Sequence, residues 1–131
     1  MIEKQFFLVK PIRENDIIDF FKNKLDLLLD SINYPKPDAK LFLQYLNYSG
    51  DIKVSINISC SNDNRIKSDD YNIATVLAKS FNTEVIFSEI NNEGKEKWIL
   101  VNSDKKYFQV EIFDENEEIY IDRNSLIPYH I

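Results

Sequence analysis

The last third of the chain constrains the fold most, because four strand-like runs follow one another with only short polar connections. The runs cover residues 84–90, 97–102, 106–113 and 118–122, and the connections are residues 91–94, 103–104 and 114–116. Strands joined by such short turns pair antiparallel, so this segment predicts a meander. The stretch 98–101 is apolar on both faces, which predicts the central strand.

A second strand signal lies near the middle of the chain. From Ile52 to Cys60, apolar and polar residues alternate strictly, which is typical of a strand with one buried and one wet face. Residues 41–48 before it fit either a helix or a strand. Their aromatic content and the turn Ser49-Gly50-Asp51 favour the first arm of a hairpin.

Two helices are expected. After a short strand at 5–9, Asn15 or Asp16 can cap an amphipathic helix that runs to about Ile32, before prolines at 35 and 37. A polar loop at 61–68 precedes the second helix, which Ser68, Asp69 or Asp70 can cap. Apolar residues 73, 76, 77 and 81 form one stripe on it.

These elements predict an α+β fold in one domain, residues 1–131. A chain of 131 residues has the size of a single domain, and 44% hydrophobic with 29% charged residues is a globular composition. We expect an antiparallel sheet of five to seven strands with the meander at its C-terminal end. Both helices should pack mainly on one face, and the apolar tail 126–131 should dock on the sheet.

The sequence favours a cytoplasmic protein. The first ten residues contain an apolar run of only four, too short for an export signal or a membrane-spanning helix. A single cysteine, Cys60, cannot form an intramolecular disulfide, which is compatible with a reducing compartment.

The net charge of −6 lies entirely in the last third. Residues 1–83 hold eleven acids and eleven bases, whereas residues 84–131 hold eleven acids and five bases. Such a surface repels phosphate backbones, so nucleic-acid binding is not expected. A basic protein partner is favoured instead, through steering and charge complementarity.

No motif for catalysis, a metal or a cofactor is present, so we predict no enzyme and no cofactor. A thiol–imidazole pair would require Cys60 and His130, the only residues of their types, to meet; Cys60 fits a small buried residue better. One Cys and one His cannot make a structural zinc site, and residues 114–118 lack the glycine and distal glutamate of a calcium loop. Gly50 and Gly94 stand alone rather than in a phosphate cradle.

One constellation remains, on the last two strands. If residues 108, 110, 112, 119 and 121 point into the core, strand alternation leaves aromatic and acidic residues together on the opposite face. From residue 111 to residue 122 there are six acids and no base. Aromatic anchors among carboxylates are typical of a protein-binding surface. The predicted partner-binding residues are Tyr107, Glu111, Phe113, Asp114, Glu115, Glu117, Glu118, Tyr120 and Asp122.

Two alternatives stay open for this face. The tail or a helix could cover it, which would make the aromatics core residues and the acids an ordinary solvated hairpin. A strand register shifted by one residue would swap every assignment between the two faces.

A resemblance adds to this interpretation. Residues 73–122 read IATVLAKSFNTEVIFSEINNEGKEKWILVNSDKKYFQVEIFDENEEIYID. This stretch resembles the helix-then-meander segment of small bacterial immunity proteins of contact-dependent growth inhibition and other polymorphic toxin systems. The resemblance implies a cytoplasmic protein that binds one cognate toxin domain, often a basic nuclease, and occludes its active site.

We therefore predict a non-enzymatic immunity protein that binds a basic toxin domain through its acidic C-terminal face. The main alternative is a generic adaptor or small assembly subunit, for instance a homodimer, that pairs through an exposed sheet or sheet edge. An enzyme or small-ligand carrier is a third class, which a deep pocket with carboxylates of raised pKa would favour.

Overall fold

The part of the chain that the structure describes forms eight strands and two helices. The computed structural model describes residues 2–25, 27, 30–31, 41–60 and 69–130. In chain order the elements are β1 (Ile2–Leu8), α1 (Glu14–Leu25), β2 (Asp30–Ser31), β3 (Leu41–Asn47), β4 (Val54–Cys60), α2 (Asp70–Phe81), β5 (Val85–Ile90), β6 (Glu96–Val101), β7 (Tyr107–Glu115) and β8 (Glu118–Pro128).

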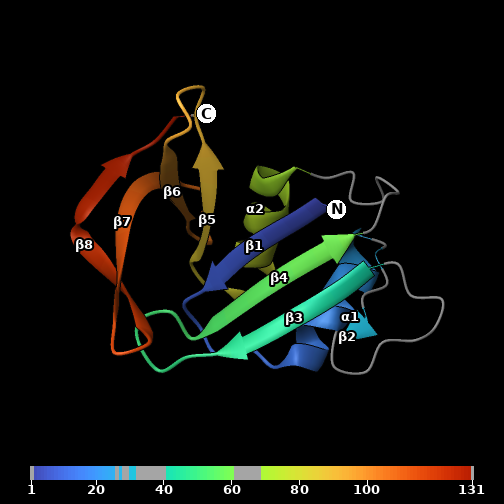
Figure 1. Ribbon diagram of the computed structural model, residues 1–131. Helices are drawn as coiled ribbons and strands as arrows, with labels where there is room; N and C mark the ends of the chain where they lie inside the picture. Colours follow the sequence, from blue (N-terminus) through green and yellow to red (C-terminus); the bar gives the residue numbers. More distant parts are fainter. Residues whose placement is uncertain (1, 26, 28–29, 32–40, 61–68, 131) are drawn as a thin grey trace.

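All the strands belong to one sheet, in the order β2-β3-β4-β1-β5-β6-β7-β8. The seven longer strands pair antiparallel, and the two-residue β2 pairs parallel with β3. Only two residue pairs, Phe7 with Ile86 and Leu8 with Val85, join β1 to β5. The sheet therefore consists of two parts that meet at the C-terminal end of β1, and Figure 1 shows β5 turning away from β1 after this short contact.

The first hydrophobic core lies between the helices and one face of the sheet. Figure 1 shows α1 and α2 on the same side of β1, β3 and β4. The alternating residues of β4 supply Val54, Ile56 and Ile58, which are fully buried against this layer. From the helices come Ile17, Phe20, Phe21, Ile73, Ala74, Leu77 and Ala78.

A second core lies on the opposite face, where the meander curls over the sheet. It is built from buried residues of five strands and one loop: Phe7, Ile52, Ile86, Leu100, Val110, Ile119 and Ile121. The lower ends of β7 and β8 approach the connection between β3 and β4 (Figure 1). Because helices cover one face and the curled hairpin covers part of the other, β6 is buried on both faces at Ile99 and Leu100.

The loop between β3 and β4 fastens this hairpin. The Ile52 amide donates to the Ile119 carbonyl at 3.2 Å, and the Asp51 carboxylate accepts from the Ile121 amide at 2.9 Å. Gly50 lies so close that a Cβ atom there would stand 2.6 Å from the Ile119 carbonyl oxygen. The loop thereby covers the edge of β8 near Ile119 and Ile121 and holds the hairpin against the second core.

Most of the predicted architecture is confirmed. The fold is α+β, with a mostly antiparallel sheet and a C-terminal meander. Residues 41–47 form the first arm of a hairpin with β4 rather than a helix. Asp69 caps α2, because its carboxylate accepts from the Asn72 amide at 2.8 Å. The tail also docks, since β8 runs to Pro128 and the Tyr129 amide donates to the Tyr107 carbonyl.

The predicted bounds of the first helix are wrong at both ends. It begins at Glu14, so Asp16 lies inside its first turn, where a carboxylate complements the helix dipole. It ends at Leu25 instead of near Ile32. The Leu27 amide donates to the Phe21 carbonyl, six residues back, instead of to a carbonyl four residues back as in a continuing helix. Residues 30–31 then pair with β3, a sheet contact that helical periodicity cannot reveal.

Two predictions about the meander also need correction. The strand β6 is interior but sixth in the sheet order, whereas β1 and β5 occupy the middle. The last turn is not residues 114–116, because β7 continues to Glu115 and the turn residues are Asn116 and Glu117. Continued pairing of residues 114 and 115 with β8 outweighs their low strand propensity.

Some predictions fall outside what the structure describes. These are the burial of the Cys60 side chain, the prolines at 35 and 37, and the loop at 61–68. Neither described helix is long and apolar enough to cross a membrane.

Candidate protein-binding hairpin

The hairpin of β7 and β8 carries the candidate site, and its turn fixes which side chains share a face. Asn116 and Glu117 both have positive φ angles, 53° and 65°, as a two-residue turn of type I′ requires. Such a turn matches the right-handed twist of the strands. It sets the cross-strand register, in which Phe113 faces Tyr120 and Glu115 faces Glu118.

One face of the hairpin presents two aromatic rings between carboxylates. Phe113 and Tyr120 stack with ring centroids 5.6 Å apart and planes inclined by 24°. Phe113 keeps 48% of its surface exposed, which is high for a phenylalanine. Two residues along the strands, Glu111 faces Asp122. We call this surface the outer face; it consists of Glu111, Phe113, Glu115, Tyr120 and Asp122.

Glu118 differs from these acids because its carboxylate is already engaged. It accepts from the backbone amides of Ser49 and Gly50 at 2.5 and 2.7 Å. The hydrogen bond from the Ser49 amide, together with that from Gly50 and the charge of Lys53, holds the pKa of Glu118 below its usual value. Glu118 therefore anchors the hairpin to the loop between β3 and β4.

Tyr107 is half-buried against α2 and is separated from the exposed aromatic pair, whereas the sequence grouped it with them. Its ring lies 5.9 Å from that of Tyr71 on α2, and its hydroxyl is hydrogen-bonded to Thr75. Strand alternation does place it on the same side of β7 as Phe113. However, α2 covers the beginning of β7, so this side is core at one end and open at the other.

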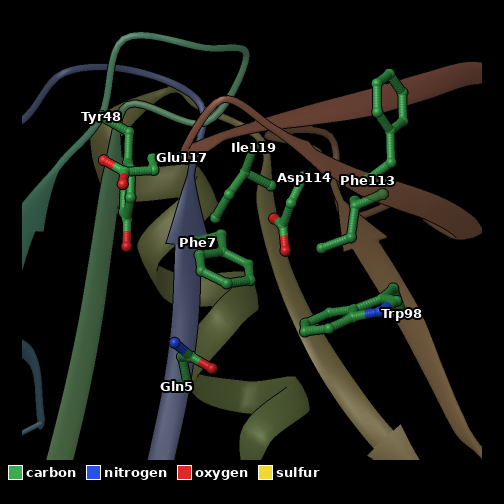
Figure 2. A pocket seen from close by; sticks show the side chains of 9 residues that line it. Gln5, Phe7, Tyr48, Trp98, Phe113, Asp114, Glu117 and Ile119 are labelled. Carbon is green, nitrogen blue, oxygen red and sulfur yellow. The ribbon is translucent and has the colours of Figure 1, made fainter.

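Asp114 lies on the inner side of the hairpin, next to the second core. It is paired with Ile119 and continues the inward alternation of Val110 and Ile112. Figure 2 shows its carboxylate directed into a concavity, whereas the Phe113 ring points away. The concavity has a volume of about 530 Å³, and we call it the inner hollow. It is lined by Gln5, Phe7, Tyr48, Trp98, Ile112, Phe113, Asp114, Glu117 and Ile119.

The inner hollow was not predicted from the sequence. Gln5, Phe7, Tyr48 and Trp98 come from segments up to 93 residues apart, and only the curl of the meander brings them together. The inward direction of Asp114 could have been found. The alternation that placed residues 108, 110 and 112 inward applies equally to the next position.

The charges of the hairpin are not neutralised by the nearest base. Arg123 follows directly after Asp122, but its guanidinium binds the Glu84 carboxylate through two hydrogen bonds of 2.8 and 2.7 Å. In the described part of the chain, no ion pair reaches Glu111, Asp114, Glu115, Glu117 or Asp122. Both sides of the hairpin tip therefore carry negative charge that is available to a partner.

A separate polar cluster joins α2, the meander and the tail. The Tyr71 hydroxyl donates to the Glu89 carboxylate at 2.6 Å, and Lys97 donates to the Tyr129 hydroxyl at 2.7 Å while lying 4.5 Å from that ring. Burial, and next the hydrogen bond to Glu89, raise the pKa of Tyr71. The contacts of this cluster fasten the tail to the helix layer.

Comparisons with protein-family models, curated proteins and solved structures found no match to this chain. Among the described residues, no three His, Cys, Asp or Glu side chains gather as a metal site would require. The hairpin has an exposed aromatic stack beside carboxylates on one side, and an acidic, aromatic concavity on the other; these carboxylates form no ion pair with any residue that the structure describes. Both features are suited to a positively charged protein surface.

Proposed function

We propose that the protein is a stoichiometric inhibitor that binds a basic protein domain through the outer face and acts without catalysis. The observation that carries this proposal is the exposed stack of Phe113 on Tyr120, flanked by the facing carboxylates Glu111 and Asp122. Binding energy at interfaces concentrates in a few aromatic anchors, and surrounding charges govern association rate and partner choice.

The hairpin is suited to binding because its shape is set before the partner arrives. The two-residue turn, the anchored Glu118 carboxylate and the Asp51 contact restrain its tip and the β8 strand. A preordered surface loses less conformational entropy on binding than a mobile loop does. The aromatic stack therefore needs little rearrangement to serve as an anchor.

The resemblance to immunity proteins supports a particular kind of partner. Such a protein would work in the cytoplasm, bind one cognate toxin domain and block that domain's active site. A nuclease domain fits the charge argument, because a surface that binds nucleic acid is basic. The acidic hairpin would then compete with the nucleic acid for the same surface.

Co-expression tests the proposal. The chain is co-expressed with the protein domain encoded immediately upstream of its own gene, and cell survival is measured with and without the chain. We expect survival with the wild type and loss of protection with Glu111→Lys combined with Phe113→Ala. Glu118 is left intact in this variant, because its replacement would also release the loop that it holds.

A matched control changes one exposed apolar residue and one exposed acid elsewhere in the chain. Ile90→Ala with Glu93→Lys also removes one exposed apolar side chain and reverses one exposed acid, at β5 and the turn after it. This variant should protect fully. Loss of protection in both variants, or in neither, would contradict the assigned face.

The adaptor alternative has one observation in its favour. Leu46 on β3 and Ile127 on β8 keep 44% and 61% of their surfaces exposed, and each lies on a strand near an edge of the sheet. Light scattering of the purified protein distinguishes the inhibitor from the adaptor. The inhibitor proposal predicts a monomer of 15.5 kDa, whereas a stable homodimer would favour the adaptor.

A further inference from the structure

We infer that the inner hollow binds an arginine or lysine side chain of the same basic partner, so that this partner contacts both sides of the hairpin. This inference rests on the proposed function for the identity of the partner. It concerns a site distinct from the outer face, because Phe113 and Asp114 are adjacent in β7 and their side chains point to opposite sides (Figure 2).

The shape of the inner hollow provides room for a side chain. Its volume of about 530 Å³ lies within the range of about 300–1,000 Å³ that is typical of ligand sites. Phe7 and Trp98 form its apolar floor, with ring centroids 5.6 Å apart. Phe7 is buried and belongs to the second core, so the floor is held in place by the fold itself.

The chemistry of the lining selects a cation. Asp114 and Glu117 contribute two carboxylates, and no lysine or arginine is among the lining residues. Trp98 and Tyr48 add aromatic rings, which attract cations through their negative faces. A side chain with an apolar stem and a charged head fits this combination, because the stem can lie along the rings while the head meets the carboxylates.

The single tryptophan makes the site directly observable. Trp98 lines the inner hollow, so its fluorescence reports on occupancy without a label. The probe is an acetylated and amidated tetra-arginine peptide, and the matched control peptide has citrulline, which is uncharged, at each position. We expect a saturable change of Trp98 emission with the arginine peptide and none with the citrulline peptide.

Two charge-matched double variants locate the effect. Asp114→Asn with Glu117→Gln removes two charges from the inner hollow, and we expect it to weaken peptide binding about tenfold. Glu111→Gln with Asp122→Asn removes two charges from the outer face and should change the affinity less than twofold. Circular dichroism and urea unfolding establish that both variants remain folded.

Several results would overturn the inference. These are equal responses to the two peptides, equal weakening by the two variants, or no response of Trp98 at millimolar peptide. Each is independent of the co-expression assay, because the peptide measurement involves no toxin. Survival conferred by a chain whose hollow binds no arginine peptide would leave the proposed function standing and remove the inner hollow from it.

Discussion

Replacing Gly50 by alanine tests whether the loop between β3 and β4 fastens the hairpin. The new Cβ atom would stand 2.6 Å from the Ile119 carbonyl oxygen and 3.2 Å from the Glu118 Cβ atom. Because Cβ atoms essentially never have a neighbour within 3.0 Å, the two backbones must separate by at least the 0.4 Å difference. The neighbour is backbone, so a change of side-chain rotamer cannot relieve the contact.

The cost follows from that separation. The hydrogen bond from the Ile52 amide to the Ile119 carbonyl already measures 3.2 Å, so further lengthening loses about 1 kcal/mol. Overpacking a tight contact adds about 1–3 kcal/mol. We expect the free energy of unfolding to fall by about 2–4 kcal/mol and the melting temperature by about 10 °C.

Urea unfolding followed by circular dichroism measures the change, and Gly94→Ala is the control. Gly94 has a φ of +77° and no atom near its missing Cβ, so alanine there should cost only the backbone strain of about 1 kcal/mol. A loss for Gly50→Ala no larger than that for Gly94→Ala would refute the close contact between the loop and β8.

Three further predictions concern stability. Asp69→Ala removes the cap of α2 and should cost about 0.5–2 kcal/mol in urea unfolding, whereas Asp69→Ser should cost a few tenths at most. Because the pKa of Glu118 is lowered in the folded state, its contribution to stability is present above its unfolded pKa near 4.5 and is lost as the pH falls through the folded pKa. Glu118→Gln should therefore make the urea midpoint depend less on pH in that acidic range, and an unchanged pH dependence would contradict the amide contacts. The pKa of Tyr71 is raised, so stability should decline as the pH rises above 10.0, where only the unfolded phenol loses its proton. Tyr71→Phe should reduce this alkaline slope while costing about 1 kcal/mol near neutrality, and an identical slope would contradict the half-buried hydrogen bond to Glu89.

Local sequence patterns were sufficient to predict the central hairpin strand, the meander and the start of the second helix. The alternation in β4 predicted a strand with one buried face, and the short connections of the meander predicted antiparallel pairing, because parallel neighbours need a long crossover. The Asp69 cap was among three candidates, and its hydrogen bond to the Asn72 amide selects it.

Three features could not be predicted because they depend on tertiary contacts: the end of α1, the position of Tyr107 and the inner hollow. The end of α1 depends on a hydrogen bond to Phe21 and on pairing of residues 30–31 with β3, neither of which periodicity expresses. The position of Tyr107 depends on where α2 lies. The inner hollow depends on the curl of the whole meander, which joins residues of β1, β6 and β7 that are far apart in the sequence.

Hydrogen exchange on the complex with the partner domain from the co-expression assay tests the central claim most directly. The one-to-one complex is purified, and the exchange of its backbone amides is compared with that of the free protein. The proposed function predicts slower exchange across residues 111–122, including the turn at Asn116 and Glu117. Protection confined to β3 and its neighbours, with residues 111–122 unchanged, would contradict binding through the hairpin.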